Sequence, residues 1–110
     1  MSFYSPWQSR VVLTLLRSRL IGKTALVGIT ENNSDGTLNS YRQLVGTIEE
    51  VRPSEGVLLK LQDGGDYWLP PDHRPIKTAP KGEYRLRSTG QIISDPDYLM
   101  TWVRTMPSST

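Results

Sequence analysis

The chain contains no cysteine and only one histidine, His73. The absence of cysteine excludes disulfides, thiolate catalysis and zinc sites built on cysteine. It is also typical of proteins from a reducing compartment, so we expect a cytoplasmic protein. A single histidine cannot form a multi-histidine metal site, and we expect neither a metal nor another cofactor.

Long hydrophobic runs are missing as well. The most apolar stretch, residues 11–21, is interrupted by Arg17 and Arg19, and residues 1–6 show no charged segment leading into an apolar run. We therefore expect neither a membrane span nor a secretory signal peptide.

The length of 110 residues provides material for one core, so we expect a single domain over residues 1–110. A hydrophobic share of 36% and a net charge of only +2 argue against disorder. Within this domain we expect a helix over about 8–20, a barrel over about 23–93 and a C-terminal segment over 95–105.

Charge is distributed unevenly along the chain. Residues 1–30 carry four bases and no acid, residues 31–66 three bases and seven acids, and residues 67–110 six bases and four acids. The three segments thus carry +4, −4 and +2. A basic opening segment of this kind marks a nucleic-acid footprint, a self-association surface or simply a solvated surface.

The first element has the spacing of an amphipathic helix. Val12, Leu15, Leu16 and Leu20 repeat at intervals of three and four residues, and Gly22 stands where a C-cap belongs. This predicts the helix over about 8–20. Three β-branched residues within it, at positions 11, 12 and 14, leave a strand as the alternative.

Short β-rich runs separated by turn residues follow this helix. They predict four strands in meander order, at 24–30, 41–51, 57–61 and 66–69. Gly46, in the middle of the second run, indicates a bend or bulge, and Asp63-Gly64-Gly65 predicts a tight hairpin. An irregular proline-containing segment over 72–82 precedes a fifth strand at 83–87 and a short sixth at 92–93.

The C-terminal segment carries helix start signals. Asp95 is a candidate N-cap, followed by proline at the first helical position and by Asp97 in the first turn. We expect a short helix here, with a strand as the alternative, and fraying of residues 106–110. The predicted fold class is mainly β: a small antiparallel barrel of five to six strands, with an N-terminal helix and a short C-terminal helix or strand.

The order of these elements resembles an SH3-like small barrel of the Sm type. The resemblance covers roughly residues 10–93 and is carried by four runs: Gly22-Lys-Thr-Ala-Leu-Val27, Val45-Gly-Thr-Ile48, Gly56-Val-Leu-Leu-Lys-Leu-Gln-Asp63 and Tyr84-Arg-Leu-Arg-Ser-Thr-Gly-Gln-Ile92. Sm-like proteins form rings that bind single-stranded RNA, so the resemblance implies RNA binding. The loop 52–55 reads Arg-Pro-Ser-Glu, where Sm-like proteins place an aspartate and a base-contacting asparagine.

A basic strand face is the candidate nucleic-acid surface. It comprises Lys77, Lys81, Arg85 and Arg87, with Arg74 upstream, and we expect it to lie near Tyr67 or Trp68. Cations that track phosphates beside aromatic rings that stack on bases suit single-stranded nucleic acid. The alternative is a solvated strand face paired to neighbouring acids.

Four apolar side chains are candidates for contact with a protein partner: Trp7, Leu13, Trp68 and Trp102. The N-terminal helix carries more apolar surface than one stripe needs, which leaves Leu13, Val11 and Trp7, with Phe3 and Tyr4, for docking or for capping the barrel. Strand alternation places Trp68 opposite Tyr67 and Leu69. Either the segment carrying Trp102 covers Trp68, or Trp68 is exposed and marks a partner site.

His73 follows Asp72 in a proline-stiffened loop, which is one way to present a proton-transfer group. No nucleophile motif, phosphate loop or acidic metal cluster accompanies it, so a structural histidine is the favoured interpretation and we assign no catalytic residue. The leading hypothesis is a non-enzymatic binding module that acts through protein partners or self-association as a homo-oligomer. An Sm-like RNA-binding protein is second, and an enzyme with a site near His73 is third.

Overall fold

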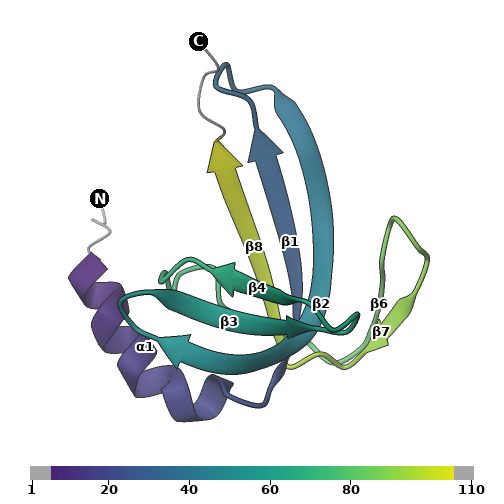
Figure 1. Ribbon diagram of the computed structural model, residues 1–110. Coiled ribbons are helices and arrows are strands. Elements are labelled where there is room, and N and C mark those ends of the chain that lie inside the picture. The colour runs from purple at the N-terminus through teal and green to yellow at the C-terminus, as the bar shows by residue number, and fades with distance from the viewer. Residues whose placement is uncertain (1–5, 106–110) are drawn as a thin grey trace.

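The computed structural model describes residues 6–105, so Phe3, Tyr4 and the expected fraying of residues 106–110 lie outside the described residues. One helix, α1 (Pro6–Leu20), precedes the strands (Figure 1). These are β1 (Thr24–Asn32), β2 (Leu38–Arg52), β3 (Gly56–Leu61), β4 (Asp66–Leu69), β5 (Lys77–Thr78), β6 (Glu83–Arg85), β7 (Ile92–Ser94) and β8 (Tyr98–Thr105). The predicted mainly-β class with an N-terminal helix is confirmed.

Six strands form one sheet in the order β4-β3-β2-β1-β8-β5, and β6 and β7 form a separate pair. The predicted meander of the first four strands is confirmed. β2 is shared between two parts of the sheet, because its residues 38–47 pair with β1 and its residues 46–52 pair with β3. Figure 1 shows the consequence: β2 curves, so that β3 and β4 cross over the lower part of β1 and β8. Over residues 6–105 the strands form no closed barrel.

Gly46 stands where the curve of β2 brings two backbones together. A Cβ atom at this position would overlap the carbonyl oxygen of Lys60 in β3. The bulge itself lies slightly further on, where the register with β3 shifts between Ile48 and Glu50. The expected irregularity in this strand is therefore present, with the close approach at Gly46 and the extra residue three positions later.

The core combines side chains from α1 with side chains from the main sheet. Its members are Leu13, Leu20, Ala25, Val27, Ile29, Ile48, Val51, Val57, Leu59, Leu69, Met100 and Trp102. Gly22 ends the helix with a φ of 86°, as the C-cap prediction requires. The N–H of Gly22 donates to the carbonyl of Ile48 at 2.8 Å, which fastens the end of the helix to β2.

The expected C-terminal helix is wrong, and the strand alternative is correct. β8 runs parallel to β1, with Ala25 opposite Tyr98 and Asn32 opposite Thr105. The two acids that suggested a helix start serve tertiary contacts instead. The Asp95 carboxylate accepts the N–H of Gly82 at 2.8 Å, and the Asp97 carboxylate accepts the N–H of Thr24 at 2.9 Å.

The fifth predicted strand is present, but it lies outside the main sheet. β6 pairs with β7, with Glu83 opposite Ser94 and Arg85 opposite Ile92. A local turn closes this hairpin: the N–H of Gly90, at a φ of 74°, donates to the carbonyl of Leu86 at 2.8 Å. Because the pairing is satisfied locally, this segment adds no strand to a barrel.

The Asp97 contacts predict that stability falls in acid. Hydrogen bonds from the backbone N–H and the hydroxyl of Thr24 lower the pKa of Asp97 below the ordinary aspartate value. Because the pKa of Asp97 is lower in the folded state, its ionised carboxylate stabilises the protein at pH values above the unfolded-state pKa of about 3.9. This stabilisation disappears as the pH falls through the folded-state pKa. Urea unfolding midpoints measured from pH 7 to pH 2.5 are expected to fall more in the wild type than in Asp97→Asn. If the unfolding midpoints of the wild type and Asp97→Asn changed equally with pH, the hydrogen bonds from Thr24 would not favour the ionised form of Asp97.

Candidate binding pocket

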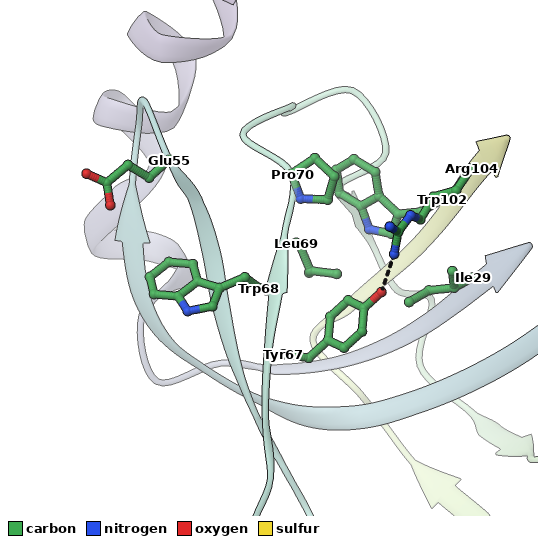
Figure 2. Close-up of a pocket in the computed structure, with 8 residues that line it drawn as sticks. All are labelled: Ile29, Glu55, Tyr67, Trp68, Leu69, Pro70, Trp102 and Arg104. Atoms are coloured by element: carbon green, nitrogen blue, oxygen red, sulfur yellow. Dashed lines mark hydrogen bonds between the residues drawn. The ribbon is translucent and has the colours of Figure 1, made fainter. Parts of the chain in front are cut away.

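A pocket of about 250 Å³ lies between β4 and β8, where the bent sheet remains open (Figure 2). We call it the seam pocket, and its lining residues are Ile29, Glu55, Tyr67, Trp68, Leu69, Pro70, Trp102 and Arg104. β4 is an edge strand of the sheet. β8 pairs with β5 only at Tyr98 and Leu99, so the same edge of β8 from residue 100 to 105 has no strand partner among residues 6–105.

The short strand β4 presents three pocket residues on alternating sides. A hairpin turn with Gly64 at a φ of 97° leads into it, as predicted, and the proline at position 70 ends it. Tyr67 is half-buried, Leu69 is buried, and Trp68 points the other way with 43% of its surface exposed. The predicted alternation is therefore confirmed, and Trp68 is an exposed aromatic at the rim of the pocket.

Trp68 is contacted by an arginine that is already neutralised. The guanidinium of Arg52 lies 5.1 Å from the ring centroid and pairs with Glu50 at 2.7 Å and Glu55 at 2.9 Å. The hydrogen bonds that Arg52 donates to the carboxylates of Glu55 and Glu50 raise the pKa of Arg52 above its ordinary value. The C-terminal segment does not cover Trp68, since Trp102 lies on the opposite wall of the pocket (Figure 2).

Trp102 carries an unpartnered polar atom. Its side chain is only 7% exposed and belongs to the core, so its ring offers little surface to a partner. Its buried Nε1 has no hydrogen-bond partner among residues 6–105. Leaving a buried donor unsatisfied costs about 1–3 kcal/mol, and native structures contain few such atoms. This wall of the pocket therefore contains a buried donor without an acceptor, which is unusual in a native structure.

Two arginines meet at the hydroxyl of Tyr67. Arg104 donates to it at 3.3 Å and Arg42 at 3.5 Å, and the Arg42 guanidinium also lies 5.5 Å from the Tyr67 ring centroid. Because both arginines are donors, the hydroxyl oxygen accepts and its own hydrogen remains available. Arg42 lies 3.8 Å from a carboxylate oxygen of Glu31, whereas Arg104 has no acidic partner among residues 6–105.

Sequence patterns did not indicate Arg42 or Arg104 as site residues. The sequence does contain one pattern that links Arg104 to Trp102. Alternation along a strand places Tyr98, Met100, Trp102 and Arg104 on one face. Only the parallel pairing of β8 with β1 brings that face against the curve of the sheet.

Of the remaining apolar candidates, one is buried and one is exposed. Leu13 is 0% exposed and belongs to the core, so its expected role in partner contact is wrong. Trp7 is 67% exposed and shares one face of α1 with Val11 and Leu15, which are 40% and 73% exposed. These three form an apolar stripe on the surface of the helix.

The four basic candidates are distributed over different elements. Lys77 lies in β5, Arg85 lies in the separate pair of strands, and Lys81 lies between them. Arg87 is placed over the ring of Tyr41, 5.3 Å from its centroid, and not over Tyr67 or Trp68 as expected. The arginines beside those two rings are Arg42, Arg104 and Arg52.

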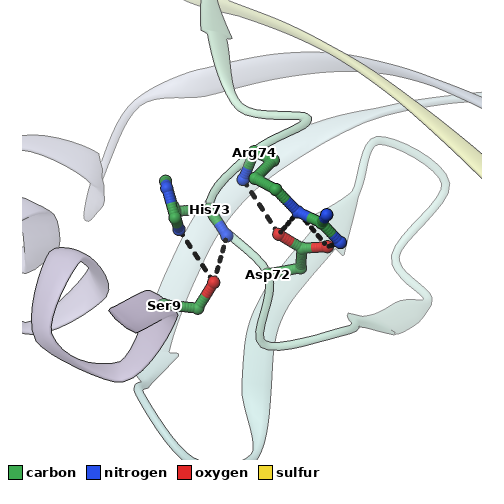
Figure 3. Close-up of polar contacts among 4 residues, drawn as sticks. All are labelled: Ser9, Asp72, His73 and Arg74. Carbon is green, nitrogen blue, oxygen red and sulfur yellow. Dashed lines mark hydrogen bonds and ion pairs between the residues drawn. The ribbon is translucent and has the colours of Figure 1, made fainter. Parts of the chain in front are cut away.

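His73 joins its loop to the helix (Figure 3). Its Nδ1 lies 2.8 Å from the hydroxyl oxygen of Ser9, which is 0% exposed and also accepts the His73 N–H at 3.4 Å. The Asp72 carboxylate turns instead to Arg74 at 2.7 Å, and the Arg74 hydrogen bond lowers the pKa of Asp72. Because Ser9 is buried, these contacts give His73 a structural partner.

Residues 6–105 contain no group of three side chains suited to hold a metal ion and no helix long and apolar enough to cross a membrane. No protein-family model, curated protein or solved structure matches the chain.

Proposed function

We propose that this protein is a non-enzymatic, cytoplasmic binding module that holds an extended segment of a partner protein in the seam pocket. The observation that carries the proposal is the open edge between β4 and β8, lined by three aromatic side chains, Tyr67, Trp68 and Trp102. We assign the fold to the SH3-like or Sm-like small barrels. The meander order and the strongly bent β2 support this assignment, with the barrel left open at the seam.

An extended segment suits an open edge for a backbone reason. Within the described part of the chain, the β8 edge from residue 100 to 105 presents N–H and C=O groups without a strand partner, and an added strand satisfies such groups. Side chains of the added segment then reach the pocket beside it. Aromatic anchors in a pocket are the residues that contribute most to protein–protein affinity, so Trp68 is the expected anchor.

The charge around the pocket favours protein over nucleic acid. Arg52, beside Trp68, is paired with Glu50 and Glu55, and Arg42, beside Tyr67, lies 3.8 Å from Glu31. Single-stranded nucleic acid needs a continuous positive groove beside stacking rings. The alternative function, RNA binding, depends on the stacked pair of Arg87 and Tyr41 together with Lys77, Lys81 and Arg85.

Selection from a library of displayed random peptides tests the proposal. We expect enriched peptides whose affinity, measured by fluorescence anisotropy, falls at least tenfold in Trp68→Ala, because a buried aromatic anchor contributes about 2 kcal/mol or more. Trp7→Ala is the matched control: it removes an exposed tryptophan from α1, away from the pocket, and is expected to leave the affinity unchanged.

Two results would contradict this proposal. Peptides that tolerate Trp68→Ala but lose binding in Trp7→Ala would move the docking surface to the apolar stripe of α1, which is also the candidate surface for self-association. Uptake of a mixed single-stranded RNA pool that weakens steeply between ~50 and ~500 mM salt, without any peptide binding, would favour the RNA alternative.

A further inference from the structure

The hydrogen-bonding groups at the seam pocket that have no acidic partner among residues 6–105 are donors. They are the Nε1 of Trp102, the guanidinium of Arg104 and the hydroxyl hydrogen of Tyr67. Glu55, the acid that lines the pocket, is occupied by Arg52 at 2.9 Å. A set of donors without a free acceptor is complementary to an anion.

The buried indole makes this set specific. A side chain that is 93% enclosed keeps a fixed position, so its Nε1 points in one direction. Figure 2 shows Trp102, Arg104 and Tyr67 along the same pocket, and the 3.3 Å hydrogen bond joins the last two. Donors from β4 and β8, which are far apart in the chain, therefore converge on one region.

We propose that the seam pocket recognises the carboxylate of an aspartate or glutamate side chain in the partner's extended segment. This inference rests on the proposed function and names the chemistry that the segment must carry. The planar guanidinium of Arg104 matches the two oxygens of a carboxylate, and charge-assisted hydrogen bonds of this type are the strong ones. Trp102 Nε1 and the Tyr67 hydroxyl supply further donors.

A carboxylate suits the local charge better than a phosphate does. Arg42 and Arg104 bring two positive charges to Tyr67, and Glu31 lies 3.8 Å from Arg42. Arg42, Arg104 and Glu31 together leave one positive charge beside the Tyr67 hydroxyl, which a single carboxylate neutralises. Apolar walls formed by Ile29, Leu69 and Pro70 strengthen such a pair by excluding water.

The carboxylate has to come from within the segment, because the open edge of β8 continues past Trp102 to Thr105. A segment paired along this edge passes the pocket and does not end in it. Entry requires a small rearrangement, since Nε1 is itself buried. Arg104 is the side chain able to move, because it is exposed and, among residues 6–105, is held by one hydrogen bond of 3.3 Å to a neutral hydroxyl.

Peptides that carry a single acidic residue, tested against matched peptides with the corresponding amide, measure the contribution of the carboxylate. We expect glutamate to glutamine in the peptide to weaken binding to the wild type at least tenfold. Trp102→Phe keeps an aromatic ring but removes the N–H. For this variant, the change from glutamate to glutamine in the peptide is expected to weaken binding less than threefold. Arg104→Gln is expected to behave in the same way, and its exposed position keeps the test valid if Trp102→Phe fails to fold.

Arg85→Gln is the matched control, because it removes an exposed arginine from β6, outside the pocket. It is expected to leave the tenfold difference intact. Equal affinity for acidic and amide peptides, with binding still lost in Trp68→Ala, would overturn the carboxylate inference and leave the proposed function standing. Loss of binding on amidation of the peptide C-terminus alone would overturn it too, since the carboxylate would then be terminal. Binding that ignores Trp68→Ala would overturn the proposed function itself.

Discussion

Leu13→Ala is expected to lower the free energy of unfolding by about 2–5 kcal/mol, the usual range when a buried leucine is truncated. Leu13 is 0% exposed and reaches from α1 into the core formed by β1, β2, β3 and β8. Removing its methyl groups leaves a cavity that the close-packed sheet cannot fill. Urea unfolding followed by tryptophan fluorescence measures the change.

Leu15→Ala provides the matched control in the same helix. Leu15 is 73% exposed, so the identical substitution is expected to change stability by no more than about 0.5 kcal/mol. Equal losses at the two positions would show that α1 does not pack against the sheet through Leu13. Both variants also test where the peptide binds. Because neither substitution lies in the seam pocket, folded Leu13→Ala and Leu15→Ala are expected to keep the wild-type affinity for the peptide.

Gly46→Ala is expected to destabilise the protein by about 3 kcal/mol or more, at or above the upper end for overpacking. The added methyl group would overlap the carbonyl oxygen of Lys60, and a backbone atom cannot swing aside as the end of a side chain can. Relief requires β2 and β3 to separate at the point where the sheet curves. Unfolding midpoints measured in urea determine the loss.

Gly65→Ala is the control for Gly46→Ala. An added methyl group at Gly65 meets side-chain atoms, with the Asp63 carboxylate oxygen at 3.3 Å and the Leu61 Cδ1 at 3.8 Å. These atoms can shift, so the expected loss is below about 1 kcal/mol. Similar midpoints for the Gly46 variant and the wild type would contradict the close approach of β2 and β3.

The elements predicted correctly depend on signals that lie within a few residues. The helix stripe ending at Gly22, the Asp63-Gly64-Gly65 hairpin and the alternation around Trp68 are each local, and each is present. Strand β8 depends on contacts made far along the chain. The acids at 95 and 97 satisfy Gly82 and Thr24, and the strand pairs in parallel with β1, about 73 residues earlier, so a local pattern of capping residues suggested a helix.

The candidate site likewise combines one feature that the local sequence predicts with two features that depend on long-range contacts. Trp68 could be predicted as an exposed aromatic, because strand alternation alone turns it away from Tyr67 and Leu69. The Arg104 contact with Tyr67 spans 37 residues and requires the position of β8. The unpartnered Nε1 of Trp102 likewise depends on the packing of the whole wall, which no spacing in the sequence reveals.

The indole N–H resonances of the three tryptophans provide the most direct test of the seam pocket. Substitution of each tryptophan by phenylalanine assigns the three signals in a ¹H–¹⁵N spectrum. On titration with a selected acidic peptide, we expect the signal of Trp102 to move downfield as Nε1 gains an acceptor, the signal of Trp68 to shift, and the signal of Trp7 to remain in place. A stationary Trp102 signal with a shifted Trp7 signal would place the binding surface on α1 and contradict peptide binding in the seam pocket.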